Sequence, residues 1–417
     1  MKILAVTMYY WPEPFRITDI CEELVRRGHE VDVLTSVPNI PDGEFYDGYG
    51  WFRHGEKQRN GVNIERVDVI RRGRGSAVRL ALNCASYAFN ALFHLPHLAR
   101  EGYDAIFVFN NSPVSTIYPA KVLSRRTGIP YSVFVLDIWP DSMYFLLGLP
   151  EKVEKPGLLR RISYAVSRSL YKDAASLLIS SPGMREKLCA MGLDNTIELF
   201  PNYAEPPKPL PDGAESITRA SLGIGDDETV IGFAGNIGKA QGLENVVAAA
   251  AMLKDTGVKF LIAGDGSELP RIKQLVAENG LEDKFIFTGW VDGALLPAYT
   301  ALCDVAVASL ADSEVLNLVL PAKVQTYMSA GLPVIAFMNG EGAKVVNEAQ
   351  CGFTAEAQNP KALAAAIKQA SQTSRDELHR MGERGKIYCE QHFDRTRVID
   401  DLERYLAEMV ERAKHKS

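Results

Sequence analysis

A glycine-rich turn at residues 235–242 combines a flexible backbone with a positive charge. Its sequence, GNIGKAQG, follows an apolar stretch rich in β-branched and aromatic residues and precedes a helical segment. Glycines let backbone amides approach a phosphate, the N-terminus of the following helix carries partial positive charge, and Lys239 adds a formal charge. The pattern predicts a phosphate-binding turn; the alternative is a tight strand-to-helix turn without a ligand.

Two better-known phosphate loops do not match this turn. A Walker A loop has the form GxxxxGK[ST], whereas Gly238 follows Gly235 too closely and Ala240 follows Lys239. A dinucleotide fingerprint, GxGxxG with a later acidic residue, has a different glycine spacing. The turn therefore indicates anion binding without either of those functions.

A second lysine stands where a helix is predicted to begin. Pro321 suits a helix start, Lys323 falls in the first turn, and Gly331 with Pro333 marks the end. A lysine in the first turn opposes the helix dipole unless an anion is bound there. An anion site is therefore one interpretation of Lys323, and a solvated surface lysine is the other.

In the first half of the chain, charged residues follow two predicted strands. Asp137 ends a buried strand beside Trp139, where its carboxylate could serve as an acid or base, orient a hydroxyl group, or cap the next turn. Arg16 follows the first strand. Its guanidinium suits a diphosphate but could equally pair with Asp19.

These residues need a scaffold of alternating strands and helices. Continuous apolar strands separated by helices indicate parallel sheets that are covered on both faces. A helix is expected at 17–27, and strands are expected at 3–8, 31–35, 105–109, 131–136, 176–179, 230–234, 259–263, 284–287, 305–308 and 333–336. In open α/β sheets ligands bind beyond the carboxyl ends of the strands, which is where the candidate residues lie.

A proline-rich stretch without periodicity after residue 201 separates two such sheets. We therefore expect a domain at 1–203, a linker at 204–228, a second domain at 229–390 and a C-terminal helix at 391–417. The 417 residues are 47% hydrophobic and carry a net charge of −6. The chain as a whole therefore lacks the excess of positive charge that is typical of nucleic-acid-binding proteins. The N-terminus has no signal-peptide pattern, which leads us to expect a cytoplasmic protein.

The order of motifs resembles family 4 glycosyltransferases that assemble bacterial O-antigen and capsule repeat units. In the second half the resemblance rests on the turn at 235–242 and then on LIAGDGSE at 261–268, FTGWV at 287–291, ALCDV at 301–305, PAK at 321–323 and YMSAGLPVI at 327–335. In the first half it rests on YYWPEP at 9–14, LVRRGHEVDVLT at 24–35 and DIWPD at 137–141. The similarity covers nearly the whole chain.

The resemblance implies the GT-B fold. In this α/β class two doubly wound, Rossmann-like domains face a cleft, and a C-terminal helix packs back on the first domain. It also implies transfer of a sugar, with retention, from a UDP-sugar held by the second domain to an acceptor held by the first. N-acetylated hexosamines and deoxyhexosamines are candidate donor sugars. No cofactor and no metal ion are required by such a design.

The resemblance assigns roles to residues at the strand ends. Asp137, Lys239 and Lys323 are expected to be catalytic, and the acceptor is expected to contact Arg16, Asn110 and Trp139. Donor contacts are expected from Gly235, Asn236, Gly238, Gln241, Gly264, Trp290, Val291, Glu314, Leu318 and Thr326. The chain departs from the family at Asn236 and Gln241, where Arg and Lys are usual, and at Leu318 and Thr326, where a pair of glutamates is usual.

A lipid-linked saccharide is the expected acceptor. The apolar segment 77–98 follows Arg66, Arg71, Arg72 and Arg74 and contains Arg79, but it is too short and too polar to span a bilayer. The region 66–98 could instead contact an anionic membrane at the inner face of the cell membrane. The alternative is a core helix beneath a surface cluster of arginines.

Two other function classes remain open at this point. A UDP-sugar 2-epimerase uses two such domains but needs acidic and histidine groups in its cleft. Apart from the terminus, the second half contains only His379 and His392, both in predicted late helices. A non-catalytic nucleotide-sugar-binding subunit would keep the donor loops and lose the acceptor site.

Overall fold

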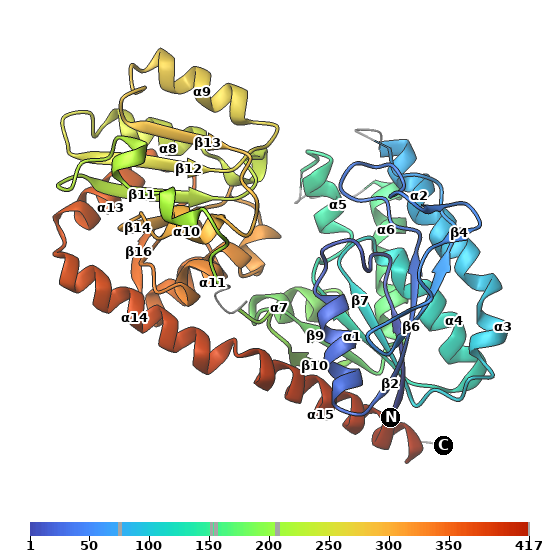
Figure 1. Cartoon of the computed structure of the whole chain (residues 1–417). Coiled ribbons are helices and arrows are strands. Elements are labelled where there is room, and N and C mark those ends of the chain that lie inside the picture. The colour runs from blue at the N-terminus through green and yellow to red at the C-terminus, as the bar shows by residue number, and fades with distance from the viewer. Residues whose placement is uncertain (74–76, 151–152, 154–156, 205–208, 416–417) are drawn as a thin grey trace. The chain divides into compact units, whose positions relative to one another are not determined.

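A computed structural model describes residues 1–73, 77–150, 153, 157–204 and 209–415 of the chain. Contacts divide the chain into two compact units (Figure 1). Unit 1 consists of Met1–Pro201 with Thr396–Ser417, and unit 2 consists of Asn202–Arg395. Each unit is built around its own sheet.

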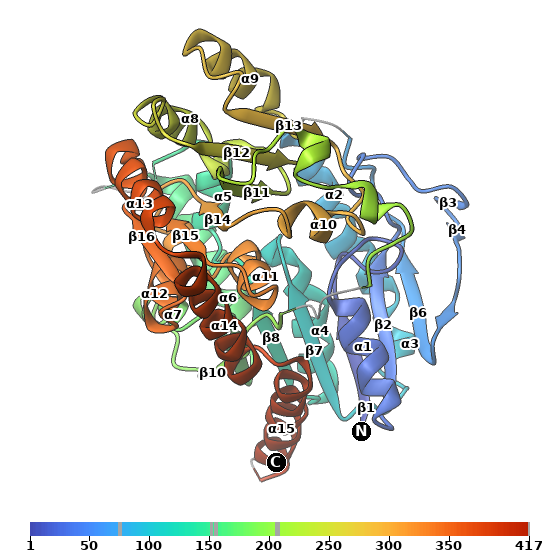
Figure 2. The ribbon, with the colours of Figure 1, turned by 60° about the vertical axis from the view of Figure 1, so that its left-hand side comes forward.

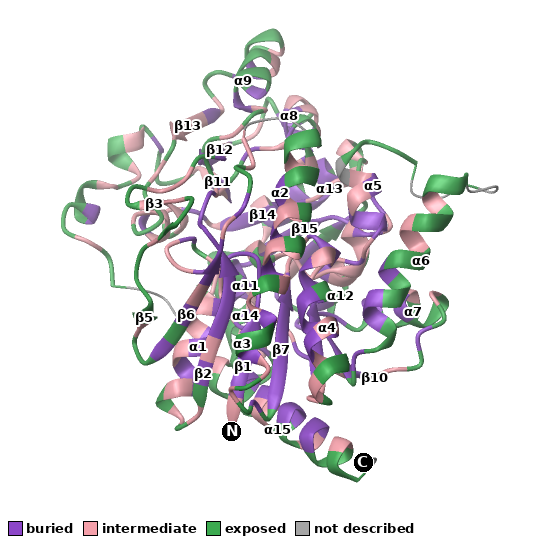
Figure 3. Ribbon diagram, turned by 90° about the vertical axis from the view of Figure 1, so that its right-hand side faces the viewer, coloured by how far each residue is buried: buried purple, intermediate pink, exposed green. Residues whose placement is uncertain are grey.

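The sheet of unit 1 has the strand order β10-β9-β8-β7-β1-β2-β6-β5. All neighbours are parallel except β5 and β6. Its central strands are buried because helices cover both faces (Figure 3). The strands are β1 (Lys2–Val6), β2 (Glu30–Ser36), β5 (Gln58–Arg59), β6 (Val62–Val67), β7 (Ala105–Asn110), β8 (Tyr131–Val135), β9 (Ser176–Ile179) and β10 (Thr196–Leu199); β3 (Tyr49–Gly50) and β4 (Arg53–His54) form a separate hairpin.

The chain leaves β1 in one direction along the sheet and returns from β6 to β7 in the other. Right-handed crossovers therefore place α1 (Ile17–Arg26) on one face and α2 (Ala77–Asn90), α4 (Ile117–Thr127) and α6 (Leu158–Lys172) on the opposite face. Helix α4 packs beside both α6 and the short turn that continues α2. The shorter elements of this unit are η1 (Ala91–Phe93), α3 (Leu95–Leu98), η2 (Val114–Thr116), α5 (Asp141–Leu146) and α7 (Gly183–Ala190).

Unit 2 contains one fully parallel sheet with the order β13-β12-β11-β14-β15-β16 (Figure 2). Its strands are β11 (Thr229–Ala234), β12 (Val258–Ala263), β13 (Phe285–Gly289), β14 (Val305–Ser309), β15 (Val334–Phe337) and β16 (Gly352–Ala355). Its helices and turns are η3 (Ala214–Ser216), η4 (Ala220–Leu222), η5 (Lys239–Gln241), α8 (Glu244–Ala251), α9 (Leu269–Glu278), α10 (Leu296–Thr300), η6 (Leu316–Leu318), α11 (Ala322–Ser329), α12 (Glu341–Glu348), α13 (Pro360–Gln372) and α14 (Arg375–His392). Apolar side chains from both faces of the sheet form its core.

The last helix, α15 (Arg395–Lys414), packs on unit 1, as the resemblance implied. Arg27, at the end of α1, donates to the Asp400 carboxylate at 2.5 Å and pairs with Glu403. His29 lies 2.6 Å from Glu403 through Nε2. Together with apolar contacts from Val398, Leu402 and their neighbours on the buried face of α15, these bonds attach the C-terminal helix to the first sheet.

The structure confirms all ten predicted strands within two residues at each end. Sequence analysis missed β5, β6, β10 and β16, which lie toward the edges of the two sheets, and the hairpin of β3 and β4. The division between the units falls after Pro201, whereas residues 205–208 of the proposed linker lie outside the described residues.

One prediction about the arginine-rich segment is wrong. Arg66 does not belong to a surface cluster, because it lies in β6 and its side chain is only 2% exposed. Its guanidinium donates to the Trp11 carbonyl at 2.7 Å and lies over the ring of Tyr49. Arg71 pairs with Glu44 at 2.5 Å, and Arg74 lies outside the described residues.

Candidate active site

The glycine turn of unit 2 lies at the point where the strand order reverses. Strand β11 has β12 on one side and β14 on the other, so the loops after β11 and β14 leave the sheet in opposite directions. A crevice at such a switch point is the usual ligand position in open α/β sheets. A donor site is therefore expected at the residues that follow Ala234 and Ser309.

The absence of side chains at two glycines lets the loops after β11 and β12 touch. A Cβ atom on Gly264 would lie 2.1 Å from the carbonyl oxygen of Gly235, and one on Gly266 would lie 2.3 Å from that of Ile237. Gly235 and Gly264 also have positive φ values, +116° and +149°. Glycine is therefore required at these places both for space and for backbone conformation.

Hydrogen bonds connect this turn to the neighbouring strand ends. The amide of Ile237 donates to the Asp265 carbonyl at 2.9 Å, and the amide of Ala311 donates to the Ala240 carbonyl at 2.7 Å. The Ser309 hydroxyl donates to the carbonyl of Gln241. Loops that follow β11, β12 and β14 are thus held as one preorganised surface.

Lys323, in the first turn of α11, brings a positive charge to the same surface. Its Nζ lies 3.5 Å from the carbonyl oxygen of Asn236 and 3.6 Å from the centre of the Phe233 ring. No carboxylate pairs with it among the residues that the structure describes. Desolvation therefore lowers the pKa of Lys323 to about 7.

An amine in this environment is suited to binding an anion. Burial disfavours the charged form of this amine when no anion is bound, whereas the face of the Phe233 ring favours it. A diphosphate beside Gly235 would supply the missing negative charge. Lys239, by contrast, is exposed in η5, where solvent already stabilises its charge.

The other predicted donor residues fall into two groups. Asn236, Thr326 and Trp290 are exposed, the last at 74%, and the Thr326 hydroxyl donates to the Ala322 carbonyl within α11. Partly buried positions are Gly238, Gln241, Val291, Glu314 and Leu318. The side-chain oxygen of Gln241 accepts a 3.0 Å hydrogen bond from the Gly238 amide, so this residue closes the turn from within.

In unit 1 the predicted carboxylate belongs to a chain of hydrogen bonds at the ends of β7 and β8. The Trp139 indole donates to the Ser112 hydroxyl at 2.7 Å, and that hydroxyl donates to Asp137 at 2.9 Å. Burial raises the pKa of Asp137 above its ordinary value, and the bond from Ser112 partly opposes this shift. Asp137 and Trp139 are thus brought together, through a serine that sequence analysis did not single out.

Asn110 lies at the end of β7, and neither polar atom of its fully buried side chain has a hydrogen-bond partner in the structure. Buried amides normally form hydrogen bonds, so an unpaired one next to Ser112 indicates a place for a polar ligand group or water. Arg16 is partly buried and immediately precedes α1. Asn110 is thus the last residue of β7, and Arg16 lies in the loop between β1 and α1.

Comparison with known proteins identifies the kind of enzyme. The model of glycosyl transferases group 1 matches residues 215–388, and the model of the glycosyl transferase 4-like domain matches residues 15–203. The chain is a glycosyltransferase of the GT-B fold. These matches assign the Gly235 surface to the group 1 domain and Asp137 to the 4-like domain.

Relatives of this glycosyltransferase include a putative colanic acid biosynthesis glycosyl transferase, WcaI of Escherichia coli K12. The two are 28% identical over 79% of this chain and 82% of the relative. The probable glycosyltransferase WbjE of Pseudomonas aeruginosa is 23% identical over 71% of this chain and 74% of its own length. Both therefore share sequence with both units.

Solved structures share the fold of the glycosyltransferase. HepE of Anabaena, solved with UDP and glucose, has a TM-score of 0.69 and 18% identity over 98% of this chain and all of its own. Sucrose-phosphate synthase from Thermosynechococcus elongatus has a TM-score of 0.72 and 18% identity over 98% of this chain and 99% of its own. At this identity the likeness shows the fold alone.

One buried ionisable residue of the glycosyltransferase, Glu13, was not singled out from the sequence, and a second, Arg66, was wrongly expected at the surface. The Glu13 carboxylate accepts hydrogen bonds from the amides of Asn39 and Ile40, both at 2.9 Å, and burial raises its pKa to about 7. Arg66 lies nearby, and its Nε and one Nη have no hydrogen-bond partner. Both residues support the loop after β1. A polar residue in the PEP turn at 12–14 was the signal that could have pointed to Glu13.

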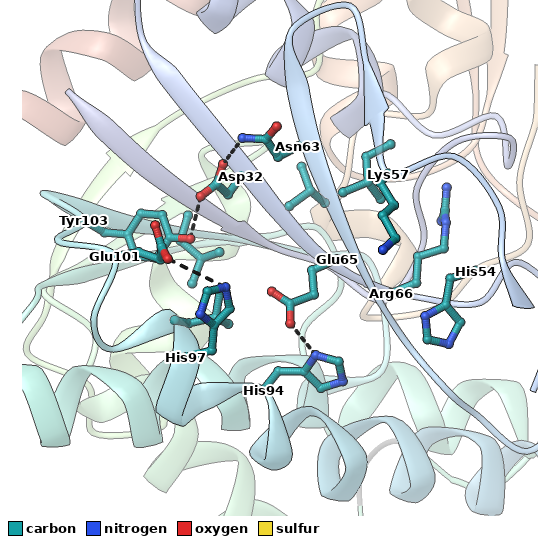
Figure 4. Close-up of a pocket in the computed structure, with 14 residues that line it drawn as sticks. Asp32, His54, Lys57, Asn63, Glu65, Arg66, His94, His97, Glu101 and Tyr103 are labelled. Atoms are coloured by element: carbon teal, nitrogen blue, oxygen red, sulfur yellow. Dashed lines mark hydrogen bonds and ion pairs between the residues drawn. The ribbon is translucent and has the colours of Figure 1, made fainter. Parts of the chain in front are cut away.

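Figure 4 shows a pocket of about 510 Å3 in unit 1 that is lined by residues of β2 and β6 and of the segment 94–103. Its carboxylates are already engaged. Asp32 accepts hydrogen bonds from Tyr103 at 2.6 Å and Asn63 at 2.7 Å, and Glu65 pairs with His94 at 2.5 Å. None of Arg16, Asn110, Asp137 and Trp139 lines this pocket, so it is not the predicted acceptor site.

Proposed function

We propose that the glycosyltransferase moves a sugar from a UDP-sugar to a lipid-diphosphate-linked saccharide, with retention, during assembly of a bacterial surface polysaccharide. The single observation that carries the donor part of the proposal is the desolvated amine of Lys323 against the glycine turn at Gly235. That amine has no acidic partner among the described residues. A leaving diphosphate is an anion of suitable charge for it.

The chemistry requires charge to develop on the leaving group. The bond between the anomeric carbon and the diphosphate oxygen breaks, and that oxygen keeps the bonding electrons. The acceptor hydroxyl oxygen forms the new bond on the same face of the sugar, and its proton passes to the leaving phosphate oxygen. Lys323 and the amides of the turn would stabilise the charge on UDP, because they are fixed before reaction.

Asp137 would orient the acceptor hydroxyl within unit 1. Its bond from Ser112 fixes the carboxylate, and Asn110 offers an amide with no other partner in the structure. Since the leaving phosphate can accept the proton, Asp137 need not be a strong base. Arg16 and Trp139 complete the proposed acceptor site.

A polysaccharide role is supported by relatives such as WcaI and WbjE, and UDP as the nucleotide is supported by the complexes of HepE. We propose N-acetylated hexosamines and deoxyhexosamines as the donor sugars to test first. The epimerase alternative is not favoured, because His379 and His392 both lie in α14, where His392 stacks on Tyr388. A non-catalytic subunit would not need the unpaired amide of Asn110.

No group of three or more His, Cys, Asp or Glu side chains that could hold a metal ion occurs in the described ranges. We propose that the positive charge at the diphosphate comes from the protein and that turnover does not depend on a divalent cation. Chelation with EDTA should then leave the rate unchanged. A rate that falls with EDTA and recovers with Mg²⁺ or Mn²⁺ would contradict this.

The proposed function is tested by incubating the purified chain with a panel of UDP-sugars and a lipid-diphosphate-sugar acceptor. Release of UDP together with labelled product on the lipid is the expected result for one sugar. Interconversion of the UDP-sugar without transfer would indicate an epimerase. Binding of every UDP-sugar without turnover would indicate a binding subunit, and either outcome would overturn the proposal.

A further inference from the structure

Helix α6 turns an apolar stripe toward solvent. Leu158, Leu159, Ile162 and Val166 are 74%, 78%, 51% and 50% exposed, although a packed amphipathic helix would bury such side chains. Their spacing places them on one side of the helix. The opposite side carries Ser167, Leu170 and Tyr171, which are buried against the rest of unit 1. The helix is thus apolar on two sides.

Helix α2 and the turn after it repeat the arrangement on the same face of the sheet. Val78, Leu82, Phe89 and Phe93 recur at helical spacing and are 70%, 46%, 61% and 71% exposed. Phe89 and Phe93 contact each other edge to face, with ring centres 5.4 Å apart. This is the segment that sequence analysis left between a membrane-surface helix and a core helix. It is amphipathic: Tyr87, Leu95 and Leu98 are buried in the core, whereas Val78, Leu82, Phe89 and Phe93 are left to solvent.

The three helices of this face contain no acidic residue. Basic residues lie on all of them: Arg79 on α2, Lys121, Arg125 and Arg126 on α4, and Arg160, Arg161, Arg168 and Lys172 on α6. Lys121 and Arg125 pair with Asp173, just beyond α6. The whole chain has a net charge of −6, so this face has the opposite sign from the molecule as a whole.

On α6 the charges and the apolar stripe are neighbours. Arg161, Arg168 and Lys172 are exposed and lie along one edge of the stripe that runs from Leu158 to Val166. Apolar side chains beside a row of cations are typical of helices that lie in the interface of an anionic bilayer. If a second copy of this chain covered the same face, its positive charges would lie opposite those of the first copy and repel them.

We propose that the solvent-exposed face of α2 and α6, here called the basic apolar face, docks unit 1 on an anionic lipid bilayer. None of the helices in the described part of the chain is long and apolar enough to span a membrane. Docking would therefore immerse the apolar stripes to the depth of the lipid headgroups, while the arginines contact lipid phosphates.

The topology relates this face to the proposed acceptor site. Helices that connect parallel strands begin at the carboxyl edge of the sheet, so Val78 and Leu158, near the starts of α2 and α6, lie toward the edge that carries Asp137. A membrane on the basic apolar face would present its headgroups close to that edge. The inference itself does not rest on the proposed function, because binding to vesicles needs no sugar donor.

Sedimentation of the full chain with lipid vesicles tests the proposal. Wild-type protein is expected to sediment with vesicles of phosphatidylcholine and phosphatidylglycerol at low salt, and much less with phosphatidylcholine alone. The double variant Leu158→Ser/Leu159→Ser should lower the partition coefficient at least roughly tenfold, because two apolar side chains remain in water. Arg161→Gln/Lys172→Gln should lower it by roughly fivefold for each charge.

A matched control removes exposed apolar side chains elsewhere. Met252 and Ile387 of unit 2 are 53% and 49% exposed, so Met252→Ser/Ile387→Ser should bind vesicles as the wild type does. Turnover of a detergent-solubilised acceptor should be unchanged in all three variants, which separates failure of docking from failure of the proposed function. Circular dichroism would show that each variant is folded.

Three results would overturn the proposal. The wild type could fail to bind anionic vesicles, or Leu158→Ser/Leu159→Ser could bind them as well as the wild type does. Analytical ultracentrifugation could also show a wild-type dimer that this double variant dissociates. That last result would assign the basic apolar face to a second copy of the chain.

Discussion

The carboxyl ends of the two sheets carry sites that are built differently. In unit 2 the surface at Gly235 consists mainly of backbone, held by close contact with Gly264, and one lysine side chain lies over it. In unit 1 the corresponding edge consists of side chains, with Trp139, Ser112 and Asp137 in one chain of hydrogen bonds.

The difference follows from what each site is proposed to bind. A diphosphate is common to all nucleoside diphosphate sugars, and backbone amides with a fixed positive charge are sufficient to hold it. An acceptor saccharide differs from one enzyme to another, and its hydroxyl groups are distinguished by side-chain donors and acceptors such as Asn110 and Asp137. Backbone changes should therefore damage the first site and side-chain changes the second.

The largest effect is expected from a single methyl group in unit 2. Gly264→Ala would place a Cβ atom 2.1 Å from the Gly235 carbonyl oxygen at a φ of +149°. We expect it to lower the free energy of unfolding by about 3 kcal/mol or more and to abolish UDP binding. Calorimetry of unfolding and titration with UDP measure the two effects.

Gly293→Ala is the matched control, because a Cβ atom there would meet nothing within 4 Å. It should unfold and bind UDP as the wild type does. Normal UDP binding by Gly264→Ala would show that the contact between the two loops is not needed, and the donor site could then not be described as a backbone surface.

The next effect concerns the charge on that surface. Lys323→Ala should lower kcat/KM by roughly 100-fold, because a preorganised charge at the leaving group is lost. Lys239→Ala should cost less, roughly tenfold, because this lysine is exposed and its charge is screened. Steady-state release of UDP measures both, and near-normal rates in both variants would contradict the assignment of the diphosphate to this turn.

Asp137→Asn probes the side-chain site of unit 1. Loss of a charged hydrogen-bonding partner should lower turnover roughly 10- to 100-fold, while the affinity for UDP stays unchanged. Ser112→Ala removes the hydroxyl that fixes the carboxylate and should have a smaller effect in the same direction. A change in UDP affinity without a change in turnover would place Asp137 outside the acceptor site.

The smallest effect is the dependence of UDP binding on pH. Desolvation lowers the pKa of Lys323 to about 7, so its amine is mostly charged below this pH and mostly neutral above it. Since UDP is an anion, its affinity should fall by roughly tenfold between about pH 6 and about pH 8. Lys323→Arg keeps its charge over this range and should lose this component of the dependence. If UDP affinity depended on pH identically in the wild type and in Lys323→Arg, Lys323 would be excluded as the source of that dependence.

The fold was largely predictable because buried parallel strands leave a strong local pattern. Strand β9, for example, is four apolar or small residues in a row, and it was predicted at its observed bounds. Strand β6 is not a continuous apolar run, because it contains Asn63, Glu65 and Arg66, so its composition resembles a loop. Its place beside β2 arises from pairing with a distant segment, which local composition does not record.

The sequence by itself determined the glycine turn, the lysines and the strand ends, because glycine and charge act through backbone geometry that is local in the chain. Tertiary structure alone decided that Gln241 closes its own turn, that Lys323 is buried over the ring of Phe233, and that Ser112 links Trp139 to Asp137. These depend on contacts between segments far apart in sequence. The same holds for the basic apolar face: a helical pattern shows that Leu158 and Ile162 share a side, but only packing determines which side of the helix is left to solvent.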